Sequence, residues 1–146
     1  MGSEERLNYT VIGNPVNLAS RLESLNKVYG TKIIISQNTK ELISDVFVVR
    51  PLDLVAVKGQ EVGNFIYELV GFRNEASRKT IELTDEYESA LKTYIDSHFE
   101  EAAKKFEVIT RQFPYDAPTT LLLKRCHHLC EHPPSNWDGV HRMSFK

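Results

Sequence analysis

The chain has 146 residues, of which 41% are hydrophobic and 26% are charged, a composition that excludes wholesale disorder. Lys and Arg number 18 against 20 Asp and Glu, and this balance excludes a strongly basic surface for nucleic acid. No apolar run approaches the roughly 20 residues that cross a bilayer, and the start lacks the apolar region of a signal peptide. The two cysteines are too few for a disulfide scaffold and favour a cytoplasmic location.

The first half of the chain alternates between helix and strand patterns. Asn14 and Pro15 are typical of a helix cap followed by proline at the first helical position. Gly30 suits the end of that helix, so we expect a helix over residues 15–29. One face of it carries the apolar positions Leu18, Leu22, Leu25 and Tyr29.

Short runs of β-branched and aromatic residues follow this helix and predict strands. The expected strands cover residues 32–35, 46–49, 54–57 and 65–70. Between the first two, Ser36 can cap a short helix that runs through Leu42. Residues 1–72 therefore read as an α+β unit with a largely antiparallel sheet.

Beyond residue 84 the pattern is helical throughout. Thr84 or Asp85 can cap a first helix, residues 98–112 form a second, and Thr119 begins a third that ends before Pro133. The polar segment 73–83 is the expected linker. The chain thus divides into an α+β part (1–72), a linker (73–83) and an all-α tail (84–146).

The segment Tyr9–Glu23 carries the most chemical information. A short strand ends at Gly13, and the helix that opens after it places Asn17 and Arg21 on one side. A guanidinium and an amide near a helix N-terminus suit a phosphate. The same spacing also describes an amphipathic helix with a solvated polar flank, and the pattern alone leaves both interpretations open.

Residues 9–23 resemble the signature of the class III nucleotidyl cyclases, including the Asn-x-x-x-Arg helix. Further stretches that resemble the family are residues 2–6, 30–36, 57–59 and 65–69. The resemblance spans about residues 2–71. It implies the C-terminal portion of a cyclase catalytic domain, a ferredoxin-like α+β fold of sheet and helices.

The resemblance implies that ATP is converted to cyclic AMP and pyrophosphate in intracellular signalling. By position, Arg21 matches the arginine that stabilises the α-phosphate in the transition state, and Asn17 matches the asparagine that orients the ribose. Lys58 matches the lysine that holds the terminal phosphates, and Thr10 matches the base-recognition position and favours adenine. Thr10 is also readable as an ordinary strand residue, and Lys58 as a turn lysine.

Two departures from the family pattern bear on activity. Asn14 stands where many bacterial members have aspartate, and it caps a helix equally well. The family's metal-binding aspartates lie upstream of the matched segment, and neither Asp45 nor Asp53 occupies a matching position. We therefore expect Mg or Mn to be bound by residues that this chain lacks, and the chain alone to be inactive.

Family members are head-to-tail dimers, which implies a homodimer or a complementing cyclase half as partner. Such domains also form the cytoplasmic end of larger membrane-bound or sensor proteins. No nucleic acid partner and no membrane segment are expected within this chain.

The helical part resembles a tetratricopeptide-like helix pair followed by the tail of bacterial cyclases. The resemblance to the helix pair rests on the small and aromatic residues and the proline at positions Ala90, Phe99, Ala102, Phe106 and Pro114. Trp137 is the expected anchor of the tail, and Cys126 and Cys130 fit no standard zinc spacing. The alternative function is a non-catalytic dimerisation or regulatory module that carries a cyclase remnant.

Overall fold

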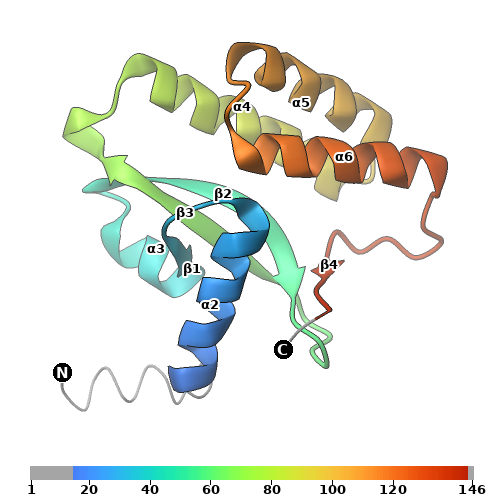
Figure 1. Cartoon of the computed structure of the whole chain (residues 1–146), viewed down its shortest axis with the longest axis horizontal. Coiled ribbons are helices and arrows are strands. Elements are labelled where there is room, and N and C mark those ends of the chain that lie inside the picture. Colours follow the sequence, from blue (N-terminus) through green and yellow to red (C-terminus); the bar gives the residue numbers. More distant parts are fainter. Residues whose placement is uncertain (1–14, 145–146) are drawn as a thin grey trace.

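The computed structural model of the chain describes residues 15–144, with side chains from Leu22 onward. The described part is a mixed α+β structure with one four-stranded sheet, as the sequence predicts (Figure 1). The strand order is β1-β3-β2-β4, and β3 runs antiparallel to both of its neighbours. The strands are β1 (Ile34–Ser36), β2 (Phe47–Ala56), β3 (Asn64–Phe72) and β4 (His141–Arg142).

The helix predicted over residues 15–29 is confirmed as α2 (Pro15–Tyr29). Gly30 ends it with a φ of +69°, and its amide donates to the Asn26 carbonyl at 2.9 Å. An L-residue rarely adopts this backbone, so glycine is favoured here. The predicted cap Asn14 lies outside the described residues.

The short helix after Ser36 is also confirmed, as α3 (Gln37–Ile43). The Ser36 side chain accepts a hydrogen bond from the Thr39 amide, which satisfies one of the free donors in the first turn.

The two strands predicted over 46–49 and 54–57 are one continuous strand, so that prediction is wrong. β2 passes through Pro51, which has no backbone N–H group and so cannot donate a hydrogen bond to a neighbouring strand. Register shifts against β3 between Val48 and Val49, and between Pro51 and Asp53, accommodate the irregularity. The proline signals a break in the sequence, whereas the folded strand bulges around it.

The first helix of the second half begins earlier than predicted, at Arg78 rather than at Thr84 or Asp85. Ser77 caps α4 (Arg78–Ile95) by accepting from the Thr80 amide at 3.1 Å. A short 3-10 helix (Arg73–Glu75) precedes it, so much of the segment predicted as a linker is helical. The first two residues of α4, Arg78 and Lys79, are charged and exposed, so the apolar spacing that marks a helix does not reach its start.

Three helices in succession form a layer on one side of the sheet (Figure 1). α4 packs on β2, α5 (Phe99–Gln112) packs between α4 and α6, and α6 (Ala117–Glu131) also meets α2. The helix predicted over 98–112 is confirmed as α5. α6 begins two residues before the predicted Thr119 because Asp116 caps it.

Among the described residues, one hydrophobic core joins the sheet, the end of α2 and the three later helices. Its members come both from before residue 73 and from after residue 83. The largest fully buried hydrophobic members are Tyr29, Leu52, Tyr87, Leu91, Tyr94, Phe106, Ile109 and Leu122. Phe99 and Phe106 are therefore committed to packing within the chain.

The segment after α6 returns to the sheet. Trp137 donates from Nε1 to the Ile95 carbonyl at 2.8 Å and contacts Tyr94 and Phe99 edge-on, at centroid distances of 5.4 and 5.0 Å. This confirms Trp137 as an anchor of the tail. β4 then pairs in parallel with the end of β2, Val55 opposite His141.

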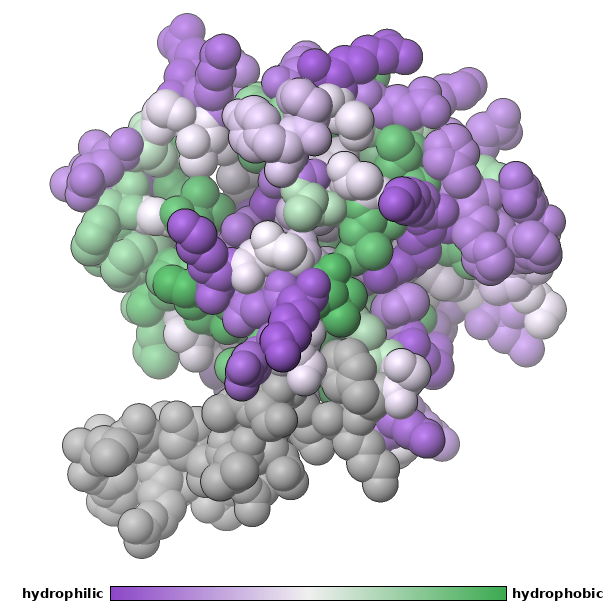
Figure 2. All heavy atoms as spheres, viewed as in Figure 1, coloured by the Kyte–Doolittle hydropathy of each residue, from purple (hydrophilic) through white to green (hydrophobic). Residues whose placement is uncertain are grey.

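The surface is largely hydrophilic over the helical layer, and hydrophobic side chains gather at the left of the view in Figure 2, near α3 and the end of β3. The exposed apolar residues there include Leu42 (83% exposed), Val46 and Phe72. Phe72 stacks on Phe47 with ring centroids 4.6 Å apart.

Candidate active site

The residues predicted to act on a nucleotide lie on two elements. Asn17 and Arg21 are in the first half of α2, four residues and so about one helical turn apart. Lys58 lies in the turn between β2 and β3. The side chains of Asn17 and Arg21, and the whole of Thr10, lie outside the described residues.

The turn that carries Lys58 projects its side chain into solvent. Gln60 donates its amide to the Val57 carbonyl at 3.0 Å, and Gly59 has a φ of +93°, which closes the chain reversal. Lys58 is exposed, so its ammonium is free of the core. In Figure 1, the start of α2 and this turn both lie at the lower edge of the view, away from the helical layer.

The other end of α2 reaches a buried charged cluster centred on Asp53. Asp53 is 0% exposed, and its Oδ2 accepts from the Tyr29 hydroxyl at 2.5 Å and from Nη1 of Arg125. Its Oδ1 accepts from the Leu54 amide at 2.8 Å. Arg125 also contacts the Tyr94 hydroxyl at 3.3 Å. We call these residues (Tyr29, Asp53, Tyr94 and Arg125) the Asp53 cluster.

A second buried cluster lies around Arg50, three residues before Asp53 on β2. Arg50 is 3% exposed and forms a two-bond pair with Asp116, at 2.8 and 3.0 Å, and an ion pair with Glu68. Its guanidinium carbon lies 4.8 Å from the centroid of the Tyr87 ring. Asp116 also accepts from both the amide and the hydroxyl of Thr119. This Arg50 cluster links β2 and β3 to Tyr87 in the middle of α4 and to Asp116, the N-cap of α6.

The protonation states of the Asp53 cluster follow from its burial. Burial, together with the Asp53 charge, raises the pKa of Tyr29, so its hydroxyl remains a donor. Burial lowers the pKa of Arg125, but the Asp53 charge, the two tyrosines Tyr94 and Tyr29 and the hydrogen bond to Asp53 together outweigh burial, so the pKa is raised and Arg125 stays cationic. A paired, hydrogen-bonded charge of this kind is tolerated in a core, whereas an unpaired one is not.

Sequence reasoning missed both clusters. Arg50 and Asp53 sit within an otherwise apolar strand sequence, and charged residues at positions expected to be buried were the available signal. Their partners could not be found by spacing, because Asp116 and Arg125 lie 66 and 72 residues away.

The two aspartates considered as metal ligands do not fit that role. Asp53 is enclosed and paired with Arg125, while Asp45 is exposed on the surface. Within residues 15–144, no group of three or more His, Cys, Asp or Glu is arranged to hold a metal ion.

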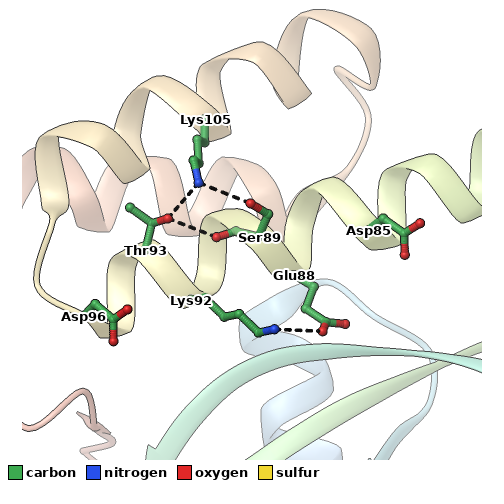
Figure 3. Close-up of a pocket in the computed structure, with 7 residues that line it drawn as sticks. All are labelled: Asp85, Glu88, Ser89, Lys92, Thr93, Asp96 and Lys105. Atoms are coloured by element: carbon green, nitrogen blue, oxygen red, sulfur yellow. Dashed lines mark hydrogen bonds and ion pairs between the residues drawn. The ribbon is translucent and has the colours of Figure 1, made fainter.

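A shallow groove between α4 and α5 holds several charged side chains (Figure 3). Lys105 of α5 donates to Ser89 and Thr93 of α4, at 3.2 and 2.9 Å. Thr93 in turn donates to the Ser89 carbonyl, and Lys92 pairs with Glu88. Lys105 therefore joins α5 to α4, while the other two interactions lie within α4, so these polar groups serve helix packing.

Comparison with known proteins shows that the chain is similar to adenylate cyclases. Residues 1–71 match the family described as adenylate and guanylate cyclase catalytic domain. The chain is 37% identical over 130 residues, 86% of its length, to "Adenylate cyclase, terminal-differentiation specific" of Dictyostelium discoideum. It is 44% identical over 71 residues to adenylate cyclase 1 of Rhizobium meliloti, and 40% identical over 72 residues to the adenylate cyclase of Anabaena cylindrica.

These relatives are much longer proteins. The chain spans 6% of the Dictyostelium protein, 11% of the Rhizobium protein and 14% of the Anabaena protein. The Rhizobium and Anabaena matches cover 49% and 47% of the chain, respectively. The Dictyostelium similarity is longer than the region matched by the family and so includes part of the helical layer.

No solved structure matches the chain significantly. Among the described helices, none has the length and apolar character of a membrane span.

Proposed function

We propose that this chain is the C-terminal portion of an adenylate cyclase catalytic domain that converts ATP to cyclic AMP and pyrophosphate. The observation that carries the proposal is the family match over residues 1–71, within which α2 places Asn17 and Arg21 one turn apart. Under this proposal, the sheet and its helices are part of a ferredoxin-like domain, and the chain works in the cytoplasm.

The reaction is an in-line attack of the ribose 3′ hydroxyl on the α-phosphorus, with pyrophosphate leaving. Negative charge grows on the phosphate oxygens, so catalysis depends on positioning and on fixed positive charge. Arg21 supplies that charge at the α-phosphate, and Asn17 holds the ribose so that its hydroxyl is aligned. Lys58 binds the terminal phosphates from its exposed turn, and Thr10 selects adenine.

The Mg or Mn ions of the family stabilise charge on phosphate oxygens when they are bound. The described residues do not fit a metal site, so this proposal assigns metal binding to a complementing cyclase half. The assembly would be a dimer in which that partner supplies the aspartates and this chain supplies Asn17, Arg21 and Lys58. The 146-residue chain alone is then expected to be inactive.

Complementation tests the proposal. The chain is mixed with a cyclase catalytic domain that keeps its aspartates and has alanines in place of its own Asn-x-x-x-Arg pair. With Mn and ATP, we expect cyclic AMP from the mixture and none from either component. Arg21→Ala abolishes it, whereas Lys27→Ala, an exposed lysine on the same helix, leaves it unchanged. GTP in place of ATP tests the adenine preference assigned to Thr10.

The same experiment separates the enzyme from the alternative, a dimerisation or regulatory module. Sedimentation reports whether the two components associate. Association without cyclic AMP would overturn the catalytic proposal and favour the module. Turnover by the chain alone would refute the assignment of metal binding to a partner.

The division into a cyclase part (1–72), a linker (73–83) and a tetratricopeptide-like part (84–146) also stays a proposal. A chain that ends at residue 72 tests it, because a separable cyclase part would stay folded, as judged by its circular dichroism. The shared core predicts that this shorter chain loses stability, since α4 and α6 cover Leu52 and Tyr29.

A further inference from the structure

The helix that carries Asn17 and Arg21 is held at its far end by the helical layer. Among the side chains of α2 that the structure describes, 22–29, Tyr29 alone donates a hydrogen bond to another element. Its acceptor is Oδ2 of Asp53, and the same oxygen also accepts a hydrogen bond from Nη1 of Arg125, a residue of α6. Asp53 is therefore a shared anchor between α2 and α6.

A second contact joins the same two helices. Gly30, directly after α2, approaches the start of α6 so closely that a Cβ at Gly30 would lie 2.7 Å from the Cβ of Ala117. Side chains of Leu25 and Tyr29 are buried in the core shared with α6, whereas Glu23 and Lys27 on the other side are exposed. The C-terminal end of α2 is thus held by β1, by Asp53 of β2 and by the close approach of α6.

We propose that Arg125 is a positioning residue for the Asn17–Arg21 helix, acting through Asp53 and Tyr29. This inference rests on the proposed function, because the helix it positions is the one that would hold the ribose and the α-phosphate. The helical layer then contributes to catalysis by positioning, because α6 fixes the axis of α2 and so the placement of Asn17 and Arg21.

The charge and burial of the cluster make the link rigid. Asp53 is completely buried, so its carboxylate has no water to turn toward and keeps its orientation. The Nη1 of Arg125 that pairs with Asp53 also lies 3.3 Å from the Tyr94 hydroxyl, and the guanidinium carbon lies 5.9 Å from the centroid of that ring. A shift of α6 would move Arg125 away from Asp53 and leave a buried carboxylate unpaired, which is strongly unfavourable.

Hydrogen exchange of backbone amides tests the link without any need for activity. Tyr29→Phe removes only the hydroxyl that ties α2 to Asp53, and leaves the ion pair with Arg125 intact. Tyr94→Phe is the matched control: an equally buried tyrosine that loses its hydroxyl next to the same guanidinium, but from α4. Neither substitution leaves a buried charge unpaired, so both variants should fold.

We expect amide exchange in α2 to speed up roughly tenfold or more in Tyr29→Phe, because a hydrogen bond to a charged group is lost. Exchange in α5 should stay unchanged, and Tyr94→Phe should leave α2 unchanged. Unchanged exchange in α2, an increase shared equally with α5, or an equal effect of Tyr94→Phe would each overturn the proposal.

The complementation mixture supplies the second readout. Tyr29→Phe and Arg125→Met should lower kcat several-fold with little change in KM for ATP, and Arg125→Lys should restore part of the rate. If the mixture with the unaltered chain makes no cyclic AMP, the proposed function fails. Amide exchange in Arg125→Met and Arg125→Lys, measured on the chain alone, still decides whether Arg125 positions α2: faster exchange in α2 than in α5 supports it, and unchanged exchange in α2 overturns it. The two failures are therefore distinguishable.

Discussion

Replacement of Arg50 by methionine should cost the protein a large part of its stability. Arg50→Met keeps the apolar stem but removes a guanidinium whose side chain is only 4% exposed. It leaves two carboxylates, those of Asp116 (9% exposed) and Glu68 (20%), without their shared cation. The contact with the Tyr87 ring is also lost.

The structure sets the size of the expected effect. Breaking a buried ion pair by removing one partner costs about 3–5 kcal/mol. Asp116 keeps its bonds from Thr119, and Glu68 is exposed enough to regain some water, so the loss should fall near the lower value. A loss of about 3 kcal/mol is a substantial fraction of the roughly 5–15 kcal/mol that typically stabilises a domain.

Urea unfolding followed by circular dichroism measures this loss. We expect a lower midpoint with an unchanged slope, since the same surface is exposed on unfolding. Arg142→Met is the matched control, because Arg142 forms its ion pair with Asp138 in solvent, with both side chains about half exposed. That variant should unfold at the same urea concentration as the original chain.

A double variant isolates the pair energy. Arg50→Met with Asp116→Asn should be less destabilised than the two single variants added together, because the second change removes a charge that the first left unpaired. A loss below about 1 kcal/mol in Arg50→Met, or simple additivity in the double variant, would refute the view that this pair stabilises the join of sheet and helices.

Three further measurements follow from the structure. Gly30→Ala should destabilise the chain by about 1–3 kcal/mol in urea unfolding. Its φ of +69° strains an L-residue, and the added methyl group would lie 2.7 Å from the Cβ of Ala117, the first residue of α6. An unchanged midpoint would contradict the close approach. A thiol reagent at pH 8 should modify the exposed Cys130 quickly and Cys126 only on unfolding, since burial raises the pKa of Cys126 to about 12; equal rates would contradict this. Burial and the Arg125 charge lower the pKa of His141 from 6.5. The unfolded chain therefore binds a proton at His141 more readily than the folded chain, and the free energy of unfolding falls as the pH drops below about 6.5. His141→Gln should flatten that fall, and an identical pH profile in the variant would contradict the role of His141.

Local signals in the sequence were sufficient for the elements that have strong caps. Pro15 and Gly30 bracket α2 correctly, and Ser36 marks the start of α3, because these residues act on backbone within a few positions of themselves. The apolar spacing of α5 likewise follows from one buried helical face.

The misses arise where packing overrides a local signal. Pro51 predicts a break, but pairing with β3 on both sides of it keeps β2 continuous through a bulge. The start of α4 is capped by Ser77, yet α4 opens with the exposed charged residues Arg78 and Lys79, which carry no apolar period. For the site, the positions of Asn17, Arg21 and Lys58 follow from the sequence, whereas the link from Tyr29 to Arg125 depends on contacts between distant segments.

The parallel pairing of β4 with β2 has a consequence for the order of folding. β2 is complete early in the chain, but the strand that covers its outer edge near Val55 comes after α6. A contact between such distant segments forms late, because closing the long loop costs chain entropy before the contact is made. While the protein is being synthesised, the edge of β2 therefore emerges from the ribosome unpaired and open to other strands. We expect a newly made chain to be most prone to aggregation in that interval. The pairing of β4 with β2 then ends this period of risk.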